Sequence, residues 1–227
     1  MYKYYEIVKI LCALSISAPL LVGLIQFRYN KGVSYRIVML YFLCAGGASI
    51  GLHIFGNLRS NNLFVFHVYT LLEFFLLMLL YRNLLHASFA KRVINRTLLF
   101  FLVFKVVDVF FVTGFYQFDA LAVTIESATL IVLSLWYFSQ LLNERTSNIK
   151  GFPPFWINSG ILIYFSSSFF IFLFSAEIIN DVERYYLYWS IHDTLVIVRD
   201  LLFTVAMAVW YRSMIARVKA ERESVYT

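Results

Sequence analysis

Seven long apolar runs follow one another along the chain, and short polar segments separate them. In a lipid bilayer every backbone polar group must bond within its own segment, and about 20 apolar residues in a helix cross the hydrocarbon core. The runs are continuously apolar, whereas strands of a β-barrel would alternate. We therefore expect an all-α polytopic membrane protein, one domain over residues 1–211 with a basic tail at 212–227. The predicted spans are 7–27, 37–55, 63–81, 97–115, 121–141, 155–175 and 190–211.

Composition narrows the class further. Of 227 residues, 61% are hydrophobic and 14% are charged, against about 25% charged in an ordinary soluble domain. A soluble core of this size cannot hide so much apolar surface, which excludes a soluble enzyme, a disordered chain and a secreted disulfide scaffold. The net charge of +6 is typical of basic loops facing anionic lipid, so we expect a bilayer and no nucleic acid as partner.

The distribution of Lys and Arg predicts the orientation. Thirteen of them fall in the connections 28–36, 82–96 and 142–154 and in the tail, and only four, Lys3, Lys9, Arg59 and Arg184, fall on the other side. The positive-inside rule then places the N-terminus outside and the C-terminus inside. The predicted outer connection 176–189 is acidic through Glu177, Asp181 and Glu183.

Prolines predict two local features. Pro19 lies inside the first run, where its missing N–H and its ring disturb a helix, so we expect a kink there. Pro153 and Pro154 precede the sixth run and favour a helix start at that point.

Ionisable residues inside the spans carry the candidate chemistry, because they are costly in lipid and usually face the bundle interior. With all carboxylates ionised and His neutral, their sum is −3, so protons, charged His, a bound cation or water must compensate, and each implies a polar cavity. The expected topology places this cavity in the outer half and middle of the bundle. The set is Glu73, Asp108, Glu126, Asp193 and Asp200, with Lys105 and Arg199 and with His53, His67 and His192.

Helical spacing groups these residues on faces. His192 and Asp193 precede Arg199 and Asp200 by seven residues, so the four share one stripe of the last span. Lys105 and Asp108 are three apart and can pair within their own helix, while Arg199 and Asp200 can pair with Glu73 or Asp108 merely to lock the bundle. The candidate ligand-binding residues are Tyr69, Thr70, Glu73, Lys105, Asp108, Glu126, Asn158, Arg199 and Asp200.

Three imidazoles, His53, His67 and His192, come from three spans, and with Asp193 they could form an open catalytic zinc site. The arrangement of Ser49 four residues before His53, of Glu73 and of His192 resembles the superfamily of alkaline ceramidases and adiponectin-receptor-like hydrolases. That family has a second His at the position of Val196, so His67 would have to replace it. The resemblance implies a zinc-dependent intramembrane hydrolase of lipid amides or esters. Its base would be Glu73 or Asp193, and Ser49 would orient the water.

A second resemblance covers longer stretches. Residues 61–75 with His67, Tyr69, Thr70 and Glu73, together with 155–159 (Phe-Trp-Ile-Asn-Ser) and 189–192 (Trp-Ser-Ile-His), look like a pattern of small uncharacterised bacterial seven-helix membrane proteins. This resemblance implies a bacterial inner membrane and a signalling context.

Three functions remain open at the level of sequence. The favoured one is a receptor-like sensing module whose outer-half pocket takes a small molecule, a lipid headgroup or protons and which signals through a partner protein. The alternatives are the zinc hydrolase and a proton-coupled transporter that uses Glu73, Arg199 and Asp200 as a relay. A retinal protein is not expected, because the last span lacks a lysine for the Schiff base.

Overall fold

The chain folds into a bundle of long helices. The computed structural model describes residues 2–30, 32–57, 62–144, 148–174 and 182–225, and within them it contains helices and no strand. The elements are α1 (Tyr2–Ser15), α2 (Ser17–Gln26), α3 (Val33–Asn57), α4 (Leu63–Leu84), α5 (Ser88–Val107), the π-helical η1 (Asp108–Val112), α6 (Ala120–Asn143), the short 3-10 helix η2 (Ile149–Gly151), α7 (Pro153–Leu173) and α9 (Val182–Val225).

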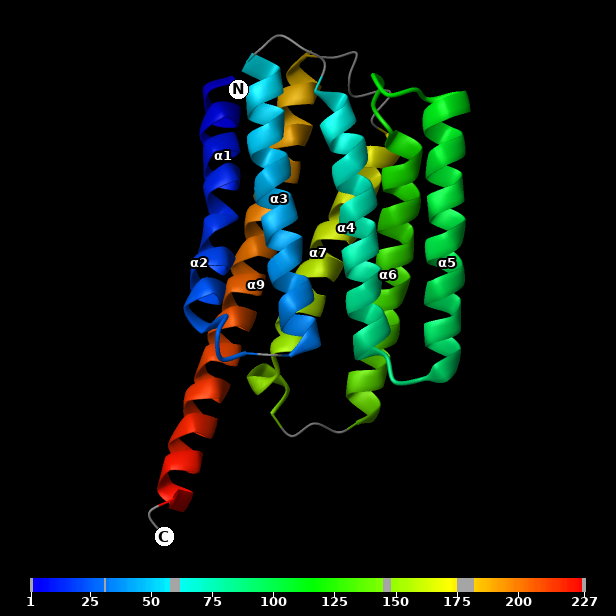
Figure 1. Cartoon of the computed structure of the whole chain (residues 1–227). Helices are drawn as coiled ribbons and strands as arrows, with labels where there is room; N and C mark the ends of the chain where they lie inside the picture. Colours follow the sequence, from blue (N-terminus) through cyan, green and yellow to red (C-terminus); the bar gives the residue numbers. More distant parts are fainter. Residues whose placement is uncertain (1, 31, 58–61, 145–147, 175–181, 226–227) are drawn as a thin grey trace.

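The helices run side by side along one axis, and the two termini lie at opposite ends of the bundle (Figure 1). We call the end that holds Tyr2, Leu63 and Ala120 the N-terminal end. Helix α7 packs between α6 and α9, α3 packs on α4, and α1 and α2 pack on α9, while α5 packs on α4 at the edge of the bundle. The 44 residues of α9 correspond to about 66 Å of helix, and its last turns project beyond the other helices (Figure 1).

Helix boundaries lie near both predicted proline positions. The first apolar run is broken at Ile16 between α1 and α2, close to Ser15, whose carbonyl the ring of Pro19 would meet in an unbroken helix. Helix α7 begins at Pro153 and Pro154, where the missing N–H groups belong to the unpaired first turn in any case.

Six helical segments of the described residues are long and apolar enough to cross a membrane: Tyr2–Gln26, Val33–Gly56, Leu63–Leu84, Ala120–Asn143, Pro153–Leu173 and Glu183–Ala216. The predicted span 97–115 is not among them. Its helix begins earlier, at Ser88, and so includes Lys91, Arg92 and Arg96. It also stops short of 115, because the π-helical turn ends at Val112 and Gly114 takes a positive φ of 80°.

Some sequence predictions fall outside the described residues. These are the acidic connection with Glu177 and Asp181, the basic residues Lys31, Arg59 and Arg145, and the first residue of the stretch 61–75.

Candidate functional site

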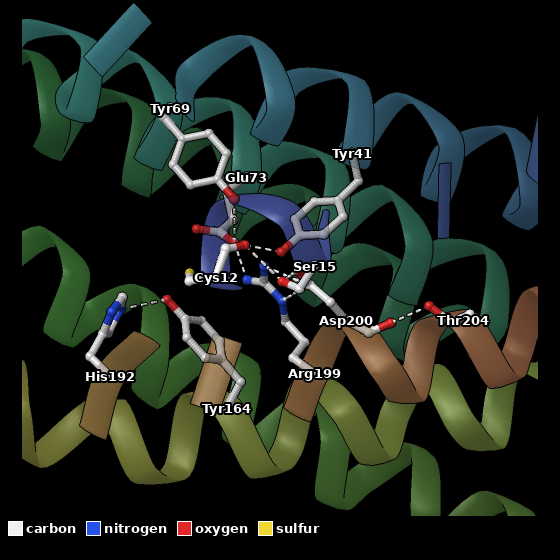
Figure 2. Close-up of polar contacts among 10 residues, drawn as sticks. All are labelled: Cys12, Ser15, Tyr41, Tyr69, Glu73, Tyr164, His192, Arg199, Asp200 and Thr204. Atoms are coloured by element: carbon white, nitrogen blue, oxygen red, sulfur yellow. Dashed lines mark hydrogen bonds and ion pairs between the residues drawn. The ribbon is translucent and has the colours of Figure 1, made fainter. Parts of the chain in front are cut away.

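Arg199 is the centre of a buried ion-pair cluster on α9 (Figure 2). Its Nε and Nη2 donate to Oδ1 of Asp200 at 3.0 and 2.9 Å, and its Nη1 donates to Oε1 of Glu73 on α4 at 3.5 Å. The three side chains are at most 6% exposed. We call Glu73, Arg199 and Asp200 the central cluster. Since two carboxylates face one guanidinium, the cluster holds a formal charge of −1 when all three groups are ionised.

Tyrosines and a serine complete the surroundings of the central cluster. Tyr41 of α3 and Tyr69 of α4 both donate to Oε1 of Glu73, at 2.8 and 3.1 Å. The guanidinium carbon of Arg199 lies 5.4 Å from the ring centre of Tyr41 and 4.7 Å from that of Tyr164 on α7, within the range of cation–π attraction. Ser15 of α1 donates to Oδ2 of Asp200 at 2.7 Å. Five helices, α1, α3, α4, α7 and α9, therefore contribute side chains to the central cluster or contact it directly.

The other two residues of the stripe expected on the last span, His192 and Asp193, lie about two helical turns before Arg199 and Asp200. His192 Nε2 lies 3.1 Å from the hydroxyl of Tyr164, and its Nδ1 lies 3.3 Å from Oδ1 of Asp193. Tyr164 thus contacts Arg199 through its ring and His192 through its hydroxyl (Figure 2). Tyr164 therefore connects the two ends of the stripe, because it contacts Arg199 at one end and His192 at the other.

A second buried ion pair lies nearer the N-terminal end. Lys105 of α5 pairs with Oδ2 of Asp119, and Nδ1 of His67 on α4 lies 3.2 Å from Lys105 Nζ and 3.3 Å from the same carboxylate oxygen. Asp119 also caps α6, because its Oδ1 accepts the N–H of Ala122 at 3.0 Å. We call His67, Lys105 and Asp119 the lateral cluster.

Both ring nitrogens of His67 are engaged in the lateral cluster. Nε2 lies 3.0 Å from the carbonyl oxygen of Gln117, an acceptor only, so Nε2 carries the hydrogen. Nδ1 lies between the ammonium of Lys105 at 3.2 Å and the carboxylate of Asp119 at 3.3 Å, so both of its close neighbours belong to the same cluster. Both nitrogens of His67 are therefore engaged by groups of the protein, which does not favour a role as a metal ligand.

The expected pair within the helix between Lys105 and Asp108 is wrong. The α-helix ends at Val107 and the chain continues as a π turn, so the regular spacing that the prediction needed ends there. Asp108 instead accepts from the hydroxyl of Thr113 at 2.8 Å, and its Oδ2 is buried with no hydrogen-bond partner in the described ranges of the chain.

Two candidate ligand residues have structural roles. Asn158 accepts from Tyr81 at 2.7 Å and donates to the carbonyl of Ser134 at 3.1 Å, which ties α4, α6 and α7 together. The hydroxyl of Thr70 donates to the carbonyl of Phe66 in its own helix at 3.0 Å. Neither group is directed at the central cluster.

The structure does not bring the three imidazoles to one point. Within the described part of the chain no group of three or more His, Cys, Asp or Glu side chains is placed to hold a metal ion. His53 is exposed on α3, His67 belongs to the lateral cluster and His192 bonds Tyr164. Ser49 is half-buried on α3. These residues do not fit the proposed zinc site.

Glu126 of α6 is the remaining buried acid. It is 1% exposed, and among the described residues its Oε1 has no hydrogen-bond partner. The charges that act on it are those of Glu73 and Lys105, one from each cluster. Glu126 is therefore close enough to both the central and the lateral cluster to interact with a charge in each.

Sequence reasoning missed several residues of the site. Asp119 had a usable signal, because an Asp directly before an apolar helical run is a typical N-cap. Tyr41, Tyr164 and Ser15 had none, since nothing in their own spans distinguishes them from the other tyrosines and serines of the chain.

No protein family model, curated protein or solved structure matches the chain.

Proposed function

We propose that the chain crosses the membrane seven times, with the N-terminal end of the bundle outside. The six apolar helices and α5 with η1 give seven passes, and an odd number agrees with termini at opposite ends (Figure 1). The second half of α5 and η1 exposes large apolar side chains, as a lipid-facing helix would: Leu99, Phe100, Val103, Phe110 and Phe111. The bias of Lys and Arg toward the connections at the other end supports this direction.

We further propose that the protein is a sensing module whose polar core responds to a small polar ligand, a lipid headgroup or protons. The observation that carries this proposal is the central cluster, where Arg199 is shared by Glu73, Asp200, Tyr41 and Tyr164. A purely structural lock would balance its charges. This core instead holds one more carboxylate than cation, which favours a role in binding.

The cluster has the properties of a switch element. In a low-dielectric interior, adding or removing one charge changes every neighbouring interaction. A ligand that engages Glu73 or Asp200 would compete for Arg199 and so favour a different placement of α4 against α9. Interfaces of this kind convert small local changes into discrete helix shifts. The projecting end of α9 (Figure 1) offers a place where a partner protein could detect the shift.

The zinc hydrolase is not favoured by any contact of the described residues, because His67 is engaged on both nitrogens. The transporter shares the central cluster with the sensor, and the relay that it needs stays a prediction.

Access from the outside tests the proposal, and Cys12 provides a native probe. Cys12 is half-buried on α1 beside the central cluster (Figure 2), while Cys44 can be removed as Cys44→Ala. We expect a small membrane-impermeant methanethiosulfonate reagent added outside intact cells to label Cys12 in that variant. The variant Cys12→Ala, which keeps Cys44, reports labelling at the other thiol. Labelling of Cys12 only after the cells are opened would contradict an outward-facing pocket.

A further inference from the structure

Glu126 lies in a part of the bundle where several buried oxygen atoms have no partner. Its Oε1 and the hydroxyls of Ser127 on α6 and Ser168 on α7 are all buried without a hydrogen bond to any part of the chain that the structure describes, and both serines are 0% exposed. Glu126 and Ser127 lie about 10 Å along α6 from its first residue, and Ser168 lies about 8 Å from the last residue of α7. Since these helices pack together in opposite directions, the three residues lie at a similar depth.

The titratable groups that face Glu126 come from three neighbouring helices. They are Glu73 on α4, Lys105 on α5 and Tyr164 on α7. Glu73 carries the same charge. Lys105 is paired with Asp119, and the hydroxyl of Tyr164 is directed at His192. No cation of this set is therefore left to pair with the Glu126 carboxylate.

The balance of buried charges leads to the same point. The buried acids are Glu73, Asp108, Asp119, Glu126 and Asp200, and the buried bases are Lys105 and Arg199. His67 lies 3.3 Å from the carboxylate of Asp119, so any charge on its ring is taken up within the lateral cluster. The cations of the two clusters pair with the carboxylates of their own cluster. Among the described residues an ionised Glu126 would therefore have no salt-bridge partner and no donor at Oε1. Such a charge is not stable in a low-dielectric interior.

We propose that Glu126 is a proton-binding site: its carboxylate takes up one proton, becomes the neutral carboxylic acid, and exchanges this proton with the aqueous phase. This inference rests on the proposed function, because it names the proton as a ligand of the same polar core. Uptake at Glu126 removes the repulsion between its carboxylate and Glu73, so protonation at one residue is transmitted to the partner of Arg199. No bond other than O–H forms or breaks.

Infrared difference spectroscopy tests the proton site on the purified full chain in lipid nanodiscs. The C=O stretch of a protonated carboxylic acid is separate from the carboxylate bands, and exchange into deuterated water shifts it. We expect the wild type minus Glu126→Gln spectrum to contain one such band that shifts on deuteration. The control Glu144→Gln, at a partly exposed acid that follows α6, should lose carboxylate bands instead.

Two outcomes would overturn the proposal. The first is a wild type minus Glu126→Gln spectrum with carboxylate bands only, since Glu126 would then be ionised. The second is a carboxylic acid band that appears only when Na⁺ and K⁺ are withdrawn, since a metal cation would then occupy the site. Glu126→Asp keeps a carboxyl group and should retain a band at a changed frequency, which guards against misfolding of the Gln variant. The spectra do not depend on signalling, so a proton at Glu126 without outside labelling of Cys12 would separate this inference from the sensing proposal.

Discussion

Replacing Arg199 by Met removes the only cation of the central cluster and keeps a side chain of similar length. In the wild type this guanidinium lies 2.9 Å from Asp200 and 3.5 Å from Glu73, and Tyr41 and Tyr164 contribute ring faces at 5.4 and 4.7 Å. The variant leaves both carboxylates buried at no more than 6% exposure with only hydroxyl donors beside them.

The expected cost follows from the burial of the pair. Breaking a buried ion pair by removal of one partner costs about 3–5 kcal/mol, because the other charge stays buried and uncompensated. This corresponds to an unfolding constant raised by roughly a hundredfold to several thousandfold. Replacing a whole buried ionic group by neutral residues of similar volume is often nearly neutral. The triple variant Glu73→Gln, Arg199→Met, Asp200→Asn should therefore recover most of the loss.

The assay is equilibrium unfolding of the purified protein in mixed micelles with increasing dodecyl sulfate, monitored by tryptophan fluorescence. Arg96→Met, at an exposed arginine of α5, is the matched control and should change the unfolding free energy by no more than about 0.5 kcal/mol. A loss below about 1 kcal/mol for Arg199→Met, or a triple variant no more stable than the single one, would refute the reasoning, because the cluster would then not be desolvated.

Two further predictions use the same assay. Gly160→Ala places a Cβ 3.1 Å from the ring of Phe203 and should lower the unfolding free energy by about 1–3 kcal/mol, because α7 and α9 pack closely there. The control Gly47→Ala, whose Cβ meets nothing within 4 Å, should be neutral or stabilising by up to about 1 kcal/mol. Equal effects at both glycines would refute close packing at Gly160. Lys105→Met removes the ammonium that pairs with Asp119 and should lower the unfolding free energy by about 3–5 kcal/mol. The double variant Lys105→Met, Asp119→Asn should regain part of this stability. A double variant that loses the full sum of the two single losses would show that the two side chains are not coupled.

Much of the fold follows from the sequence, because a bilayer restricts the solutions. Long apolar runs in lipid form helices, and the helix boundaries at Pro153 and the break before Pro19 follow from the missing proline N–H. The exception was 97–115. Hydropathy detects only the apolar stretch. The helix begins earlier, at Ser88, and includes Lys91 and Arg92, because charged side chains do not prevent a helical backbone.

The site was predictable mainly where its residues share a helix, and the pair between Arg199 and Glu73 was one of two alternatives that the buried charges left open. Spacing along one helix grouped Tyr69 with Glu73 and Arg199 with Asp200. Contacts between helices depend on rotation and depth, which spacing does not contain. The pairing of Lys105 with Asp119 illustrates this, because it joins a helix to the cap of the next one.

We expect the Arg199–Glu73 pair to control the distance between α4 and α9 at the end of the bundle opposite the N-terminal end. The measurement is a double electron–electron resonance distance between spin labels at Arg82 and Arg212, which are exposed near that end of α4 and on α9, in a background with Cys12→Ala and Cys44→Ala. We predict that Glu73→Gln shifts or broadens the distance distribution, while Glu144→Gln leaves it unchanged. An identical distribution for the wild type and Glu73→Gln, with both proteins folded, would contradict the claim.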